Sequence, residues 1–262
     1  MRIALAADLH FGSVPEGLAV ELADAIKDQH PTVTVIAGDL TLRARSEEFE
    51  QAQTWLQSLA PPVLVIPGNH DLPFWNIIKR FSAPFHLYQK AANAVTLMPV
   101  IEQPGGLVLG FNTTGSWQPH LRWQEGVARR NDIEAAKQAL AAAPPDQFKA
   151  VAAHHPFVKV PEVPRARPVR RAPEALDAFA AAGVDLIMSG HTHQSFAIET
   201  KVGERSILSV GAPTALSTRM RGEANGFWII EANKDAIVCM LWLRNGTNFS
   251  PASEKVFPRI RG

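Results

Sequence analysis

The stretch TVTVIAGD at residues 32–39 decides the fold class of this chain. Two stretches of the same design flank it, RIALAADLH at residues 2–10 and VLVIPGNHD at residues 63–71. Each begins with the aliphatic and β-branched residues of a buried strand and ends in the small and polar residues of a loop. Between them, residues 16–29 and 46–58 carry apolar side chains at helical spacing. The β-α-β-α-β order predicts parallel strands with right-handed crossovers, and therefore an α/β fold.

The remainder of the chain continues this alternation and then becomes rich in strands. Further helices are predicted at residues 74–80, 131–143 and 173–182. Further strands are predicted at residues 94–97, 107–112, 150–153 and 184–188, followed by an antiparallel meander at residues 195–200, 207–210, 227–231 and 237–243. No internal repeat or low-complexity linker interrupts the pattern, so we expect a single domain over residues 1–262.

The composition is that of an ordinary globular protein. Of the 262 residues, 46% are hydrophobic and 19% are charged, which argues against intrinsic disorder. The 26 Lys and Arg residues nearly balance the 25 Asp and Glu residues, so a globally basic nucleic-acid-binding protein is excluded. The single cysteine, Cys239, excludes a disulfide framework and a thiolate zinc site. The sequence shows neither a signal peptide nor an apolar run near the roughly 18 residues of a membrane span, so we expect a cytoplasmic protein without membrane association.

Polar residues gather where five of the predicted strands end. The clusters are Asp8-Leu9-His10, Gly38-Asp39, Gly68-Asn69-His70-Asp71, His154-His155 and Gly190-His191-Thr192-His193. They contain six of the nine histidines, which is too many for histidines scattered over surface and core. Sites in open α/β sheets form outside the carboxyl ends of the strands, so we expect these side chains to share one site.

The spacing within and between the clusters supports this convergence. The first three clusters follow one another at intervals of about 30 residues, the length of one βαβ unit. In an extended segment, residues i and i+2 point to the same side, so the paired residues of the first and last clusters can approach one point. These pairs are Asp8 with His10 and His191 with His193. Imidazole, carboxylate and amide donors without sulfur suit divalent Mn, Fe, Zn or Co.

In this order, the five clusters resemble the motifs of the calcineurin-like metallophosphoesterase superfamily, which are D-x-H, G-D, G-N-H-D/E, H and G-H-x-H. The match spans residues 8–193. The resemblance implies a four-layer α/β-β-α sandwich, in which helices flank two mixed central sheets. It also implies a centre of two divalent metal ions and a small anionic phosphate-ester substrate. Two divalent ions with two aspartates leave a net positive centre, which would attract a phosphate ester.

The resemblance further assigns a role to each residue. The first metal would be held by Asp8, His10 and His193, and the second by Asn69, His154 and His191. Asp39 would bridge the two metals, and His70 would be the catalytic acid that protonates the leaving group. The H-x-P pattern selects His154 over His155 as the ligand. His155 would then either line the substrate pocket or pack as an ordinary loop residue.

Differences between this sequence and other branches of the superfamily indicate which branch it most resembles. A purple acid phosphatase would have a tyrosine ligand three residues after Asp39, where this chain has Leu42, and its single tyrosine is Tyr88. The sequence most resembles the class III cyclic-nucleotide and glycerophosphodiester phosphodiesterases. We therefore expect hydrolysis of phosphodiester bonds through a hydroxide that bridges the metals, on cyclic nucleotides or small phosphodiesters with broad specificity.

Other functions stay open. The superfamily also contains DNA-repair nucleases, phosphomonoesterases and non-catalytic scaffolds, although no added DNA-binding segment indicates a nucleic-acid substrate. Residues 156–171 carry five basic residues and one acidic residue, and would either attract anionic substrates or form a solvated loop. Phe74, Trp117 and Trp123 would either stack on a base or pack within the protein. The metal, the physiological substrate and the oligomeric state are not determined by the sequence.

Overall fold

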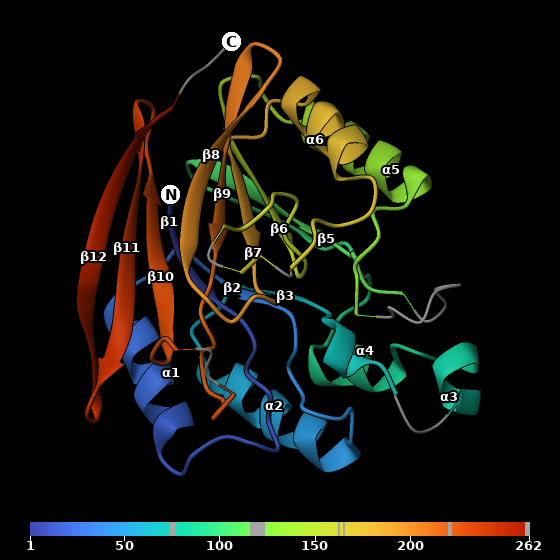
Figure 1. Cartoon of the computed structure of the whole chain (residues 1–262), viewed down its shortest axis with the longest axis vertical. Coiled ribbons are helices and arrows are strands. Elements are labelled where there is room, and N and C mark those ends of the chain that lie inside the picture. Colours follow the sequence, from blue (N-terminus) through green and yellow to red (C-terminus); the bar gives the residue numbers. More distant parts are fainter. Residues whose placement is uncertain (74–76, 116–123, 162, 165, 220–221, 260–262) are drawn as a thin grey trace.

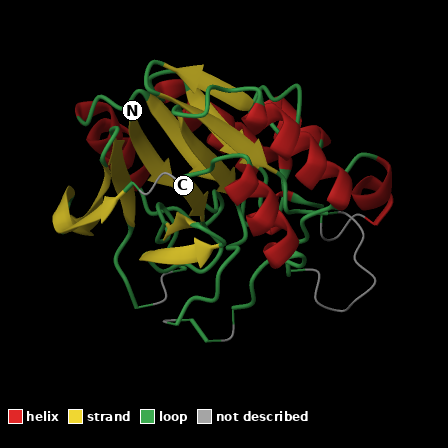
Figure 2. Cartoon of the chain, turned by 90° about the horizontal axis from the view of Figure 1, so that it is seen from above, coloured by secondary structure: helices red, strands yellow, loops and turns green. Residues whose placement is uncertain are grey.

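The structure, a computed structural model, describes residues 1–73, 77–115, 124–161, 163–164, 166–219 and 222–259. Over these residues, two six-stranded β-sheets pack face to face and helices cover their outer faces (Figure 1). Figure 2 shows the arrangement from above, with helices on both sides of the strands. The expected four-layer α/β-β-α sandwich with two mixed sheets is therefore confirmed.

The first sheet has the strand order β12-β11-β10-β1-β2-β3. Its parallel half consists of β1 (Arg2–Ala6), β2 (Val33–Ala37) and β3 (Val63–Ile66). Helices α1 (Leu18–Asp28) and α2 (Ser46–Ser58) connect these strands, which confirms the predicted β-α-β-α-β unit. Its antiparallel half consists of β10 (Gly226–Ala232), β11 (Ala236–Asn245) and β12 (Asn248–Pro258).

The second sheet has the strand order β4-β5-β6-β7-β9-β8. Its four central strands are parallel and comprise β5 (Gly106–Phe111), β6 (Phe148–Ala153), β7 (Leu186–Ser189) and β9 (Arg205–Gly211). The antiparallel edges are β4 (Val100–Gln103) and β8 (Phe196–Val202). Helices α5 (Arg130–Ala141) and α6 (Ala172–Ala181) lie in the connections to β6 and β7.

Apolar side chains fill the space between the two sheets. Val35 of the first sheet and Met188 of the second are fully buried in this layer. Trp228 of β10 is also buried there, and its indole N–H donates to the carbonyl of Gly211 in β9 at 2.8 Å. This hydrogen bond joins one sheet to the other. Separate apolar layers lie under α1 and α2 and under α5 and α6, so both sheets are held on both faces and their edges are rigid supports for loops.

Some local predictions were wrong. Residues 94–97 form no strand, because the edge strand begins at Val100, and Val95 is 98% exposed. The predicted meander is divided between the sheets, since β8 and β9 extend the second sheet while β10 and β11 extend the first. Strand β12 was not predicted, because it is an edge strand with mostly exposed side chains and two prolines, and so lacks the alternation of a buried strand.

Two short helices follow β3. Helix α3 (Ile77–Ser82) overlaps the helix predicted at residues 74–80, and α4 (His86–Ala91) was not predicted. Among the helices that the structure describes, none has the length and apolar composition needed to cross a bilayer.

Candidate metal centre

Seven polar side chains from five loops converge at the edge between the two sheets. They are Asp8, His10, Asp39, Asn69, His154, His191 and His193. The first four follow β1, β2 and β3 of the first sheet, and the other three follow β6 and β7 of the second. The expectation that these residues meet is therefore correct, and the meeting point lies between two sheets.

The first cluster consists of Asp8, His10 and His193. The Nε2 atoms of His10 and His193 lie 3.5 Å apart. The Oδ1 atom of Asp8 is 3.6 Å from Nε2 of His193 and 3.9 Å from Nε2 of His10. All three side chains are buried. Two nitrogens and one oxygen therefore face a common point at distances that a single cation would occupy.

The second cluster consists of Asn69, His154 and His191. The amide oxygen of Asn69 lies 3.1 Å from Nε2 of His154 and 3.1 Å from Nδ1 of His191. Here too, one oxygen and two ring nitrogens converge. This is the set that the sequence motifs implied for a second metal.

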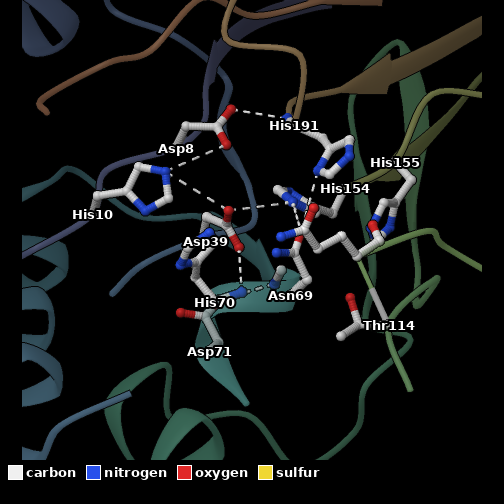
Figure 3. A network of polar contacts seen from close by, with 12 residues as sticks. Asp8, His10, Asp39, Asn69, His70, Asp71, Thr114, His154, His155 and His191 are labelled. Carbon is white, nitrogen blue, oxygen red and sulfur yellow. Dashed lines mark hydrogen bonds and ion pairs between the residues drawn. The ribbon is translucent and has the colours of Figure 1, made fainter. Parts of the chain in front are cut away.

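Asp39 lies between the two clusters (Figure 3). Its Oδ2 atom is 3.8 Å from Nε2 of His10 and 3.5 Å from Nε2 of His154. Burial opposes ionisation of this carboxyl, but the neighbouring His154 and His70 rings outweigh it and hold the pKa of Asp39 well below its usual value. Asp39 therefore presents a charged oxygen to both clusters at once.

The outer ring nitrogens of two of these histidines are held by backbone carbonyls. Nδ1 of His10 lies 3.2 Å from the carbonyl of Thr41, and Nδ1 of His154 lies 2.9 Å from the carbonyl of Ala37. A carbonyl only accepts, so Nδ1 carries a proton and Nε2 is the ring nitrogen that faces the centre. Metal-binding histidines are oriented in this way by their outer nitrogen. The donors therefore fit two divalent cations.

The local backbone conformation explains how neighbouring side chains in each motif converge. Nine non-glycine residues in the described part of the chain have positive φ, and five of them belong to this centre. These are Asp8, His10, Asp39, His191 and His193, with φ between 48° and 68°. The sequence argument from extended backbone was therefore wrong, because left-handed turns bring Asp8 and His10 together. Such conformations are unfavourable for L-residues and concentrate at functional sites.

Three glycines of the motifs allow the loops to approach one another. A Cβ at Gly38 would lie 2.5 Å from Nδ1 of His154, and one at Gly190 would lie 2.8 Å from Oδ2 of Asp8. A Cβ at Gly68 would overlap the carboxylate and the backbone nitrogen of Asp39. Close packing at these positions therefore requires glycine, even where φ is ordinary, as at Gly68 with φ −105°.

Asp71, the last residue of the G-N-H-D motif, ties two of these loops together. Its buried carboxylate accepts the backbone N–H groups of Gly68, Leu40 and Thr41 at 2.9, 3.2 and 2.9 Å. Burial and the adjacent Asp39 carboxylate raise the pKa of Asp71 to about 6. The carboxylate thus fixes the loop after β2 against the loop after β3, which sets the position of Asp39.

His70 lies beside the centre and outside both clusters. Its backbone N–H donates to Oδ1 of Asp39 at 2.8 Å, and its Nδ1 donates to the carbonyl of Leu42 at 2.8 Å. Its Nε2 therefore has a lone pair, and it accepts from Nη1 of Arg219 at 3.2 Å. The sequence analysis missed Arg219, which lies in the connection from β9 to β10 and carries no motif.

His155 is buried behind the second cluster. Its Nδ1 lies 2.8 Å from the hydroxyl of Thr113, and its Nε2 donates to the carbonyl of Gln124 at 2.9 Å. Its ring packs 4.5 Å from that of His191, centroid to centroid. Burial and the neighbouring His191 and His154 rings hold the pKa of His155 well below its usual value. Both nitrogens are engaged, so the geometry favours the packing role over a role in the substrate pocket.

The basic segment at residues 156–171 contacts the connection between β5 and α5. The backbone N–H of Arg170 donates to the carbonyl of Gly126 at 2.9 Å, and Arg167 lies 3.9 Å from Glu125. The cavity next to Asn69 and His70 is lined by other basic residues, Arg43 and Arg219. Three aromatic residues considered for base stacking and one arginine of the segment lie outside the described residues. These are Phe74, Trp117, Trp123 and Arg165.

Comparisons with known proteins agree with this geometry. A family model for calcineurin-like phosphoesterase matches residues 1–195. A curated relative from Synechococcus sp., named probable cyclic nucleotide phosphodiesterase, is 24% identical over 209 residues. The matched region covers 75% of this chain and 74% of the relative.

Solved structures share the fold at low sequence identity. A dimetal phosphatase from Danio rerio has a TM-score of 0.69 and 12% identity, and the match covers 99% of both chains. Purple acid phosphatase PPD1 from yellow lupin has a TM-score of 0.68 and 13% identity, and the match covers 99% of this chain but 54% of the lupin chain. These likenesses show the fold alone.

The single tyrosine of this chain, Tyr88, is buried and donates to the carbonyl of Val65, so it is not at the centre.

Replacing Gly68 by alanine should weaken metal binding at the centre. The backbone of Gly68 suits any residue, but the added methyl group would displace Asp39. We expect Gly68→Ala to bind fewer than two metals per chain when metal content is measured by mass spectrometry. Gly203→Ala is the matched control, because φ is +60° there and no atom lies within 4 Å. The control should lose about 1 kcal/mol of stability and keep its metals. Full metal content in Gly68→Ala would contradict the packing argument.

Metal affinity should increase with pH. Burial alone would lower the pKa of His154, but the Asp39 carboxylate outweighs it and raises the pKa to about 9 in the metal-free protein. Below that pH, a metal must displace the proton of His154. We expect the affinity for Mn²⁺ to rise about tenfold per pH unit from about pH 6.5 to about pH 8. Calorimetric titration in two buffers of different ionisation enthalpy would report about one released proton. Affinity that does not vary with pH would contradict this assignment.

Proposed function

The chain belongs to the calcineurin-like phosphoesterase family, and from that premise we propose that it is a phosphodiesterase with a binuclear metal centre. The observation that carries the proposal is the position of Asp39. Its Oδ2 atom lies 3.8 Å from a nitrogen of the first cluster and 3.5 Å from a nitrogen of the second. An oxygen in that position suits a ligand shared by two cations about 3.5–4 Å apart. A closed structural site would hold one ion among four ligands.

We assign each cluster to one ion. The first ion would be held by Asp8, His10 and His193, the second by Asn69, His154 and His191, and both by Asp39. The donors are nitrogen and oxygen atoms, so Mn, Fe, Zn and Co are the candidate metals. When bound, two such ions would supply a nucleophile near neutral pH and offset the charge of the phosphoryl group.

His70 is the proposed catalytic acid. Its ring is held by the hydrogen bond from Nδ1 to the Leu42 carbonyl, and its backbone is held by the hydrogen bond to Asp39. These two contacts leave Nε2 on the side of the cavity that Asn69, His70 and Arg219 line. To act as the acid, Nε2 would have to release Arg219 and take up a proton, which it could then pass to a leaving oxygen that enters from the cavity.

The proposed preference for diesters rests on the charge of the metal centre and on similarity to a relative with a named activity. Two divalent ions with two aspartates give a centre of modest positive charge, which suits the single negative charge of a diester. The relative from Synechococcus sp. is named a probable cyclic nucleotide phosphodiesterase, which supports cyclic nucleotides as candidate substrates. A phosphomonoesterase or a nuclease of the same superfamily is the alternative, and a panel of substrates separates the three.

A substrate panel tests the diester assignment. With Mn²⁺ bound, we expect bis(4-nitrophenyl) phosphate to be hydrolysed at least about tenfold faster than 4-nitrophenyl phosphate, measured as kcat/KM. Cyclic AMP should be hydrolysed, and long single-stranded DNA should be hydrolysed at least about tenfold more slowly. Asp39→Asn should lose at least one metal and about 10²-fold or more in rate, because the shared charge is removed. The exposed Asp146→Asn is the control. Faster turnover of the monoester would reverse the assignment.

A second prediction concerns His70. An alkoxide leaving group needs a proton far more than nitrophenolate does, so His70→Ala should slow alkyl diesters by about 10²–10⁴-fold and aryl diesters much less. Metal content should stay near that of the unchanged protein. The measurement is kcat across diesters of graded leaving-group pKa. An equal loss for every leaving group would remove the acid role and indicate that His70 binds a phosphoryl oxygen.

A further inference from the structure

A cavity of about 430 Å³ lies beside the candidate metal centre, with Asn69 and His70 in its wall. Arg43 and Arg219 also line it, and no acidic side chain does so among the residues that the structure describes. Arg43 follows β2, whereas Arg219 precedes β10, so the two arginines reach the cavity from separate loops. Neither arginine belongs to the proposed metal ligands.

Both arginines keep an uncompensated positive charge. Within the described part of the chain, no carboxylate lies within 4 Å of the guanidinium of Arg43 or Arg219. Glu48 is close in sequence to Arg43, but its carboxylate accepts the backbone N–H of Arg43 at 2.7 Å and lies in the buried start of α2. By contrast, Arg244 on another face pairs with Glu21 at 2.9 Å. The two unpaired charges therefore gather where the substrate would enter.

The loop that carries Arg219 is anchored, so the charge is held at the cavity. The backbone N–H of Arg219 donates to the hydroxyl of Ser217 at 3.1 Å. The backbone N–H of Thr218 donates to the carbonyl of Ser13 at 3.1 Å, and the hydroxyls of these two residues lie 2.7 Å apart. The guanidinium itself is exposed and lies 3.2 Å from Nε2 of His70. It therefore stands next to the proposed acid, on the side of the leaving group.

Arg43 and Arg219 bring two positive charges to this cavity, whereas a simple diester carries one negative charge. We propose that Arg43 and Arg219 bind a second phosphate group, carried by the leaving group of the substrate. The preferred substrates are then diesters whose leaving group is a phosphorylated nucleoside. Guanidinium groups recognise phosphate by paired, charge-assisted hydrogen bonds, and two of them from separate loops can hold one phosphate from two sides. The inference rests on the proposed function, because His70 defines the side of the leaving group.

Binding to the metal-free protein tests the arginines without turnover. We expect 5′-AMP to bind at least tenfold more tightly than adenosine in calorimetric titration. Arg43→Gln and Arg219→Gln should each weaken 5′-AMP at least tenfold. Arg130→Gln is the matched control, since the Arg130 side chain is 74% exposed and pairs with Glu174 away from the cavity. The control should bind like the unchanged protein. Equal binding of 5′-AMP and adenosine, or binding unaffected by both cavity variants, would overturn the proposal.

Turnover by the Mn²⁺-loaded enzyme then separates two roles for the arginines. The substrates are the dinucleotide ApA and its terminally phosphorylated forms pApA and ApAp. We expect kcat/KM for one phosphorylated form to exceed that for ApA at least tenfold, and the ratio to fall toward one in Arg219→Gln. A loss by the same factor for all three substrates would place the arginines on the scissile phosphate and overturn the proposal. If no diester is hydrolysed, the proposed function fails, whereas binding of 5′-AMP still decides the role of the arginines.

Discussion

Two hydrogen bonds that cross between the sheets define the geometry on which the rest of the centre depends. Nδ1 of His154, after β6, donates to the carbonyl of Ala37 at the end of β2 at 2.9 Å. The backbone N–H of His191, after β7, donates to Oδ2 of Asp8 at 2.9 Å. These contacts align the carboxyl ends of two sheets that share no ladder of hydrogen bonds. Because the edges meet there, Asp39 from one sheet lies within reach of histidines from both.

Such an arrangement is unfavourable in isolation and has to be held by the surrounding fold. Asp8 and Asp39 are buried carboxylates, and five residues of the centre adopt left-handed backbone conformations. Each such conformation costs about 1–3 kcal/mol and persists only where packing over-determines it. The apolar layer between the sheets, with the Trp228 hydrogen bond to Gly211, supplies that packing beneath the loops. The carboxylate of Asp71 also holds these loops, because it accepts backbone N–H groups from the loop after β2 and from the loop after β3. The metal ions that the donors fit would offset the buried charge.

Much of the fold could be predicted because its decisive features are local in sequence. The first three strands and their two helices are short, strongly patterned segments, and parallel neighbours joined by helices follow from that order. The donors could be predicted too, since the turn after a strand is the place where a ligand residue can leave the sheet. Residues 94–97 and β12 were assigned wrongly because edge segments have mixed exposure, and local pattern does not distinguish them from loops. Single-domain organisation stays a prediction.

The sequence by itself determined the α/β class, the types of donor atom and the strands that carry them, because each depends on residues close together in the chain. The tertiary structure decided the rest, since each remaining feature joins distant segments. Contacts separated by 183 residues bring His191 to Asp8, and contacts separated by 149 residues bring Arg219 to His70. The division of the C-terminal strands between two sheets, the packing of His155 and the pairing of two loops around the cavity also belong to this second group. No local pattern encodes these features, because they follow from how the two sheets pack against one another.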